Sequence, residues 1–424
     1  MKFLRIGICA LLVFAVAAHG AVEDWARAVL ETGAGLLFLA WAARSYFCKQ
    51  EQLVISPLLP PLAALSLVVL GQWLFHRTAS AYDTRQELQL LIADVLLLFL
   101  ASQVFRALED WRGFFWFVMG FGFFIAVFGI LQQLTFNGKL YWFREMRYGG
   151  IPFGPYVNRN HFAGFAELVI PVALVPLVLG KVRRERWFLV GLFAVLPMGA
   201  LFLSASRGGI LSFGVELAAL ALWMVVKRRV VGAQLLAVGA VLLVAILLVS
   251  WLGVGQVLQR FSSLQSLEVS ERKRASMRRD TWRIFLEHPW TGTGLGTLQT
   301  VFPRYDTLYD GKIVNHTHND YLEALAETGI AGGLCCAWFL GVLLFDPIRR
   351  LWLDSDSFAA ALHLAGLLGC VGFLVHSLVD FNLHIPANAL LFFLMAHLAT
   401  GEIQPAIPET GASRHSRKHR RNPD

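Results

Sequence analysis

Charge is scarce in this 424-residue sequence: only 16% of the residues are Asp, Glu, Lys or Arg, whereas 56% are hydrophobic. The mean hydropathy is +0.57. A soluble domain of this length needs more charge to cover its surface. The formal net charge of +8 does not indicate a nucleic-acid-binding protein either, because the basic residues stand in short clusters between apolar runs. The composition therefore predicts a membrane protein with no nucleic-acid partner.

Cysteine is also rare. The chain has five, and none of them falls in the long polar stretch between residues 253 and 328. Their spacings predict neither a disulfide framework nor a metal site, and nothing else in the sequence calls for a cofactor. The sequence also lacks the internal repeat that marks many transporters.

Long apolar runs, by contrast, recur along the whole chain and are typical of membrane-spanning helices. The first run has the outline of a signal peptide, but another follows closely, so an uncleaved helix is expected. Prolines 57, 60 and 61 predict that the third span is kinked or broken there. The expected fold is an all-α polytopic membrane protein with about twelve spans, near residues 3–22, 27–47, 53–75, 88–107, 113–135, 161–180, 187–204, 209–226, 231–252, 328–347, 358–380 and 384–401.

The positions of Lys and Arg set the orientation of these spans. Basic residues concentrate in the connections on the N-terminal side and in the tail from Arg414 to Arg421. The positive-inside rule therefore places both termini in the cytoplasm and the long loop outside. The expected divisions are helices one to nine in 1–252, an outer loop in 253–327, helices ten to twelve in 328–402 and a basic cytoplasmic tail in 403–424.

The outer loop interleaves aromatic and charged residues, which is typical of an ordered, functional segment. Within it, residues 275–288 predict an amphipathic helix ending at Pro289. Asp280 and Arg279 fall on its polar side, but Arg278 falls near the centre of the apolar face. Arg278 either snorkels to lipid headgroups or points at an anionic group held at the membrane surface. The apolar face itself comprises Met277, Trp282, Ile284, Phe285 and Leu286.

Two short motifs follow this helix. Gly292, Gly294 and Gly296 have the wrong spacing for a dinucleotide fingerprint and predict a tight turn re-entering the membrane surface. His316 and His318 then stand two residues apart beside the tenth span. We find no further ligand in the sequence to complete a metal set with them. A histidine here suits a base or a hydrogen-bonding orienter, because its pKa allows proton transfer at neutral pH, or else it caps a helix.

The stretch His318-Asn319-x-x-Leu322-x6-Gly329 resembles the signature of the bacterial O-antigen ligase and O-antigen polymerase superfamily. Three further stretches are similar to that family. They are Ser204-Ala205-Ser206-Arg207-Gly208-Gly209, the run from Arg278 through Trp282 and His288-Pro289 to Gly296, and His376-Ser377-Leu378-Val379-Asp380-Phe381-Asn382. The family's large outer loop between the ninth and tenth of about twelve spans matches the expected topology.

This resemblance implies a glycosyltransferase of the bacterial inner membrane with a periplasmic active site. A sugar hydroxyl would attack the anomeric carbon of a glycan carried on undecaprenyl diphosphate, inverting that centre without a metal ion or other cofactor. Its partners would be this lipid-linked donor, a glycan or lipid A-core acceptor, and membrane lipids. By motif position, Arg207 and Arg278 would clamp the diphosphate and His318 would activate or orient the acceptor hydroxyl. The further candidates for substrate binding are Arg279, Arg159, Asn160, His316, Asn319, His376 and Asp380.

Two of these candidates have alternative interpretations. Arg279 is the rival of Arg278, because one residue of slippage exchanges them. His376 and Asp380 stand four apart on one predicted helix face, which allows them to pair with each other. They either line the cavity or lock two helices, and the structural role is slightly favoured.

Three functions compete at this stage. A ligase moves a finished glycan to lipid A-core, whereas a polymerase of the same superfamily joins repeat units; both fit the motifs, and ligase is placed first only because the signature commonly carries that name. A flippase or transporter of lipid-linked glycans should carry charge along its mid-membrane positions, which here hold only a few acidic residues such as Asp94, Glu167 and Glu216. A sensor or scaffold would not need the arginine and histidine motifs.

Overall fold

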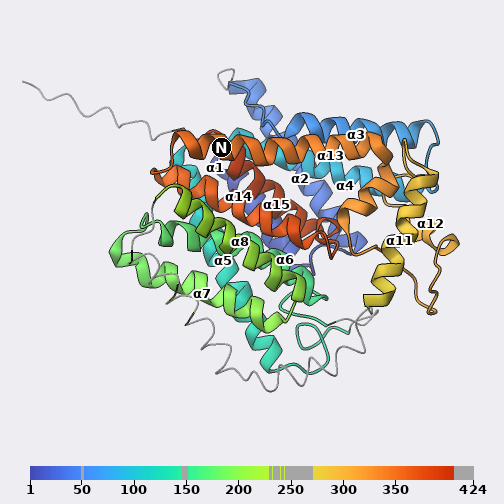
Figure 1. Ribbon diagram of the computed structural model, residues 1–424. Coiled ribbons are helices and arrows are strands. Elements are labelled where there is room, and N and C mark those ends of the chain that lie inside the picture. The colour runs from blue at the N-terminus through green and yellow to red at the C-terminus, as the bar shows by residue number, and fades with distance from the viewer. Residues whose placement is uncertain are drawn as a thin grey trace, which may run out of the picture.

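The computed structural model describes residues 1–48, 52–145, 151–228 and 271–404, together with 232, 239 and 243. In this part of the chain the protein is a bundle of helices (Figure 1). The elements are α1 (Lys2–Ala17), α2 (Asp24–Cys48), α3 (Leu59–Leu74), α4 (Ala81–Val104), α5 (Leu108–Leu134), α6 (Arg159–Val178), η1 (Arg184–Arg186), α7 (Trp187–Ser204), α8 (Arg207–Val226), α11 (Glu271–Glu287), α12 (Leu298–Val301), η2 (Phe302–Arg304), α13 (Asp320–Leu353), α14 (Phe358–His376), η3 (Asn382–His384) and α15 (Pro386–Thr400).

The all-α polytopic fold is confirmed. Among the described residues, eight helices are long and apolar enough to cross a membrane: α2, α4, α5, α6, the η1–α7 stretch, α8, α13 and α14. Helices α1, α3 and α15 coincide with three further predicted spans but are shorter. The ninth predicted span, 231–252, lies almost entirely outside the described residues, as do the start of the outer loop and the tail from 405.

Helix α6 lies at the centre of the bundle, and all its residues except Asn160 are buried. Helix α14 packs along it at close range because glycines face the contact. A Cβ added at Gly369 would lie 3.3 Å from the backbone oxygen of Glu167, and one at Gly366 would lie 2.8 Å from that of Met395 in α15. Small residues allow this approach of helix backbones in apolar surroundings.

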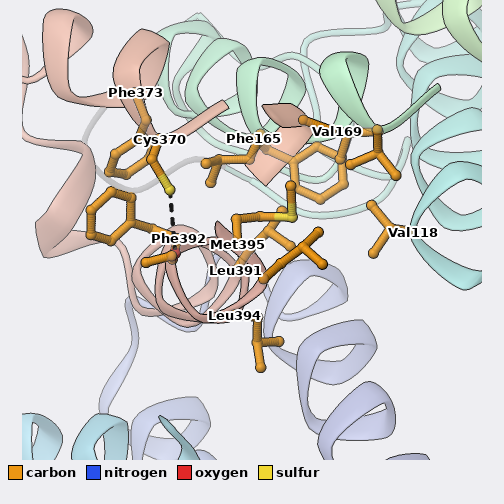
Figure 2. Packing of buried hydrophobic residues seen from close by; sticks show 14 of the residues in the cluster. Val118, Phe165, Val169, Cys370, Phe373, Leu391, Phe392, Leu394 and Met395 are labelled. Atoms are coloured by element: carbon orange, nitrogen blue, oxygen red, sulfur yellow. Dashed lines mark hydrogen bonds between the residues drawn. The ribbon is translucent and has the colours of Figure 1, made fainter. Parts of the chain in front are cut away.

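The apolar core fills the space between these helices. Phe165 and Val169 of α6 lie beside the α14 and α15 side chains, and Cys370 points at the backbone oxygen of Phe392, 3.9 Å away (Figure 2). Cys370 is fully buried, so it serves as core packing. Large apolar side chains remain exposed on the outer faces of spanning helices, as expected of a surface that meets lipid; Phe188 is 84% exposed.

The third predicted span is interrupted at Pro57, since residues 53–58 are not helical, but Pro60 and Pro61 produce no kink. Helix α3 begins only at Leu59, so Pro60 and Pro61 occupy its first turn and Pro57 precedes it. Proline is tolerated in the first turn, because the backbone N–H groups there have no partner within the helix.

Helix α13 is broken at Gly329, whose φ of 64° and ψ of −163° are not helical. The turn that contains Gly292, Gly294 and Gly296 packs against this break. Gly294 N donates to the oxygen of Glu327 (2.9 Å), and Ile330 N donates to that of Pro289 (2.7 Å). A Cβ on Gly292 would lie 2.3 Å from the oxygen of Glu327, so a side chain has no room there. The turn thus supplies the backbone partners that a broken helix requires.

Helix α11 confirms the helix predicted in the outer loop but not its orientation. Asp280, expected on the polar side, is fully buried and accepts bonds from Thr307 N (3.1 Å) and Ser276 Oγ (3.0 Å). Trp282 and Leu286, expected on the buried apolar face, are 46% and 58% exposed. The prediction was wrong because polar partners in the loop compensate the burial of a carboxylate, which hydrophobic periodicity alone does not reveal.

Candidate functional site

His318 and Asp380 form a hydrogen-bonded pair. His318 precedes α13 and Asp380 follows α14, and His318 Nδ1 lies 3.1 Å from Asp380 Oδ1. The His318 backbone has a φ of 53°, which is uncommon for a residue other than glycine. Since the carboxylate is an acceptor, Nδ1 carries the hydrogen and Nε2 is the nitrogen available to a substrate.

Asp380 is fully buried. Burial by itself would raise the pKa of its carboxyl, but the hydrogen bond from His318 and the neighbouring imidazoles hold that pKa well below its usual range. Asp380 is therefore a carboxylate at neutral pH. It fixes one tautomer of His318 and would stabilise the imidazolium after proton uptake.

The ring of Phe381 orders the imidazoles around this pair. The His318 ring meets it edge-on with centroids 5.0 Å apart, and the His316 ring stacks on it at 4.4 Å. His161 of α6 contacts the same ring at 4.9 Å. One phenyl ring thus joins the start of α6, the segment before α13 and the segment after α14.

His316 belongs to a second cluster, with Glu323 of α13 and His384 of η3. His316 Nδ1 lies 2.7 Å from Glu323 Oε1, and His384 Nε2 lies 3.3 Å from the same oxygen. The expectation that no further ligand joins His316 is wrong, because the fold brings His384 to it from the far end of the chain. These three residues have the donor types of a metal site.

The second cluster is nevertheless satisfied by its own hydrogen bonds. Glu323 Oε2 accepts from Thr317 N at 2.8 Å, and His384 Nδ1 is bonded to Asp320 Oδ1 at 2.8 Å. Burial by itself would lower the pKa of His384. The neighbouring carboxylates of Glu323 and Asp320 outweigh this effect and raise the pKa to about 10. His384 is therefore an imidazolium at neutral pH, donating to two carboxylates. The geometry is that of a charged hydrogen-bond network.

Arg207, the candidate cation, is the first residue of α8. Ala205 adopts the left-handed conformation that ends α7, and Ser206 Oγ accepts from Gly209 N at 3.2 Å to begin α8. This two-residue connection leaves the Arg207 side chain exposed. The backbone of the next residue, Gly208, packs on His376, whose Nε2 would lie 2.7 Å from an added Cβ.

His376 and Asp380 do not pair with each other as predicted, because α14 ends at His376 and the chain turns before Asp380. His376 Nδ1 instead lies 2.9 Å from Glu167 Oε1. Asn319 contacts the turn between His376 and Asp380, because its Nδ2 donates to Leu378 O at 2.9 Å. Its Oδ1 accepts from Leu322 N at 2.9 Å and so caps α13. The amide of Asn319 is thus engaged within the protein.

The other candidates lie on two helices. Arg159, which is buried, and Asn160, which is half-buried, open α6 beside His161. Arg278 and Arg279 lie on α11, which packs against α13. Arg278 is half-buried next to the buried Met277, whereas Arg279 is exposed.

This difference in burial predicts which arginine acts. The Arg278→Ala variant should lose glycan transfer by about 10²- to 10³-fold, the usual cost of removing one charge-stabilising donor. Arg279→Ala should stay within about threefold, since exposed charges are screened and weakly coupled. Transfer rates of both variants, each normalised to folded protein, check this; equal losses in the two would contradict the assignment.

Residues 192–337 match the family model described as O-antigen ligase. This match covers about a third of the chain and supports its resemblance to the O-antigen ligase and polymerase superfamily. A comparison with curated proteins finds no match. The matched region contains Arg207, Arg278 and His318, so the resemblance stated from the motifs is confirmed. Together with the spanning helices, the match supports a multi-pass membrane protein with ligase-like or polymerase activity in general.

Several residues of the candidate site were missed in the sequence. Glu323 and Phe381 lie inside the quoted motifs, but nothing in their spacing indicates their contacts. Glu167 did carry a signal, since a carboxylate inside an apolar helix is costly unless it is used. His384 carried none, because its partners lie more than sixty residues before it.

Proposed function

We propose that this protein transfers a glycan from undecaprenyl diphosphate to an acceptor sugar hydroxyl at the periplasmic face of the inner membrane, as an O-antigen ligase. The observation that carries the proposal is the His318–Asp380 pair. Residues 376–380 connect this pair to the turn that carries Arg207, because His376 contacts Gly208. A base and a fixed cation are the two groups that this reaction needs.

The reaction follows from these residues. The acceptor oxygen attacks the anomeric carbon from the face opposite the leaving group, and its proton passes to His318 Nε2. The bond between that carbon and the diphosphate oxygen breaks, and undecaprenyl diphosphate leaves with the electron pair. Arg207 and Arg278 offset the negative charge that develops on it. Asp380 stabilises the imidazolium formed on His318.

Deletion of the gene followed by electrophoresis of the surface glycolipids tests the function. A ligase predicts core without glycan and an accumulation of long lipid-linked polymer. A core bearing a single repeat unit instead assigns the polymerase reaction of the same superfamily. An unchanged glycolipid pattern, with lipid-linked intermediates also unchanged, would overturn both.

A further inference from the structure

A fully buried polar contact beside the proposed site joins Glu167 of α6 to His376 of α14. Both side chains are buried, with exposed fractions of 0% and 1%, and Glu167 Oε1 lies 2.9 Å from His376 Nδ1. Neither residue is accessible to a sugar or a diphosphate. A carboxylate and an imidazole buried at this depth are costly to keep, so a role that does not require contact with substrate is indicated.

The turn that carries Arg207 rests on this pair. A Cβ added at Gly208 would lie 2.7 Å from His376 Nε2, and one at Gly209 would lie 3.2 Å from Glu167 Oε1. Gly209 also faces Ala163 of α6, 2.5 Å from its added Cβ. The two glycines therefore let the backbone on either side of Arg207 settle directly onto the imidazole and the carboxylate.

His376 also begins the turn that leads to Asp380, the hydrogen-bond partner of the proposed base His318. Val379 N and Asp380 N both donate to His376 O, at 2.9 and 3.0 Å, which fixes the turn leading to Asp380. Asp320 N donates to Ser377 O at 2.9 Å, and Tyr321 OH donates to Leu374 O at 2.8 Å. Residues 374–380 are thus bonded to the residues directly after His318 while their first turn contacts Gly208.

We propose that the Glu167–His376 pair is a positioning device that sets the Arg207 turn at a fixed distance from the His318–Asp380 pair. This inference rests on the proposed function. In the reaction described above, the cation must meet the diphosphate while the base meets the acceptor hydroxyl. Glu167 and His376 contact the turn that carries Arg207, and the His376 backbone oxygen accepts the hydrogen bonds that shape the turn leading to Asp380. The pair therefore links the cation to the His318–Asp380 pair. Glu167 and His376 act through these neighbours and touch no reacting atom.

The test compares variants of the buried pair in full-length protein reconstituted in nanodiscs. The donor is the undecaprenyl-linked glycan extracted from the deletion strain, and the acceptor is lipid A-core from the same strain. Glu167→Gln and His376→Asn should raise the KM for donor about 10- to 100-fold, the cost of a small misplacement of a catalytic group. The KM for acceptor should stay within about twofold, because the His318–Asp380 hydrogen bond is retained. Glu167→Asp should recover part of the donor affinity.

Glu216→Gln is the matched control. Glu216 is also a buried carboxylate, but it stands deeper on α8 and faces Gly372 rather than Gly208 or Gly209. Its donor KM should equal that of the wild type. Gly208→Ala should reproduce the donor defect, whereas Gly214→Ala in the same helix should not, since nothing lies within 4 Å of a Cβ there.

The outcomes separate the two proposals. Wild-type transfer in this assay supports the proposed function, and its absence counts against that function whatever the variants do. With an active wild type, a defect confined to donor KM supports the positioning role. Loss of folded protein with an unchanged KM in the remaining fraction, or an equal donor defect in Glu216→Gln, would overturn it.

Discussion

The His318→Ala variant should transfer glycan about 10²- to 10⁴-fold more slowly than the wild type, which is the usual contribution of a positioned general base. Its KM for donor should change little, because the diphosphate is held elsewhere in the proposed site. The measurement is the single-turnover rate with extracted lipid-linked glycan. His76→Ala is the matched control, because His76 is exposed and has nearly the same backbone φ, 54° against 53°.

Asp380→Asn extends this result. An asparagine can present an N–H where the carboxylate presents an oxygen, so the imidazole tautomer with Nε2 as acceptor is no longer enforced. The rate should fall by a similar factor, and the double variant should be no slower than the slower single variant, since the two residues act as a unit. Additive losses in the double variant would contradict the pairing.

Arg207→Ala should lower the rate of transfer by about 10²- to 10³-fold, because a fixed cation would no longer offset charge on the departing diphosphate. Arg207→Lys should recover part of this loss: lysine keeps the charge but lacks the planar fork that binds two phosphate oxygens. Arg184→Ala is the control, an exposed arginine on the connection between α6 and α7.

The Arg207 variants should also bind donor more weakly, which can be measured with the extracted lipid-linked glycan under conditions without acceptor. An Arg207→Ala protein that is folded, binds donor normally and transfers at the wild-type rate would remove Arg207 from the site. In that case Arg278 would have to act alone, and the contact between Gly208 and His376 would have only a packing role.

Hydrophobic runs were sufficient to predict most of the spans. Helices α4 to α8 begin or end within several residues of the expected bounds, because a membrane span must satisfy all its backbone groups internally and must therefore be long, apolar and helical. The glycine turn illustrates the limit of this approach. The three glycines of this turn were identified in the sequence. The break at Gly329 lies in α13, however, and only the packing of the two segments shows that the turn supplies hydrogen-bond partners to the broken helix.

The site shows the same division. Arg207, Arg278 and His318 were proposed as site residues by motif, because each sits in a short local pattern. Their partners were not, since Asp380 was paired with His376 on the assumption of a continuous helix. The helix ends at His376, which frees Asp380 to meet His318 and turns His376 toward Glu167.

By itself, therefore, the sequence determined that this protein is a bundle of membrane helices, which family it resembles and which three residues are the main candidates for its chemistry. The tertiary structure decided which carboxylate meets which imidazole, that Phe381 gathers three histidines, and that His384 joins His316 and Glu323. The physical reason is the distance along the chain between the residues that interact. Apolar runs and motifs are local along the chain, whereas a buried charge is stabilised by partners that the fold brings from distant helices.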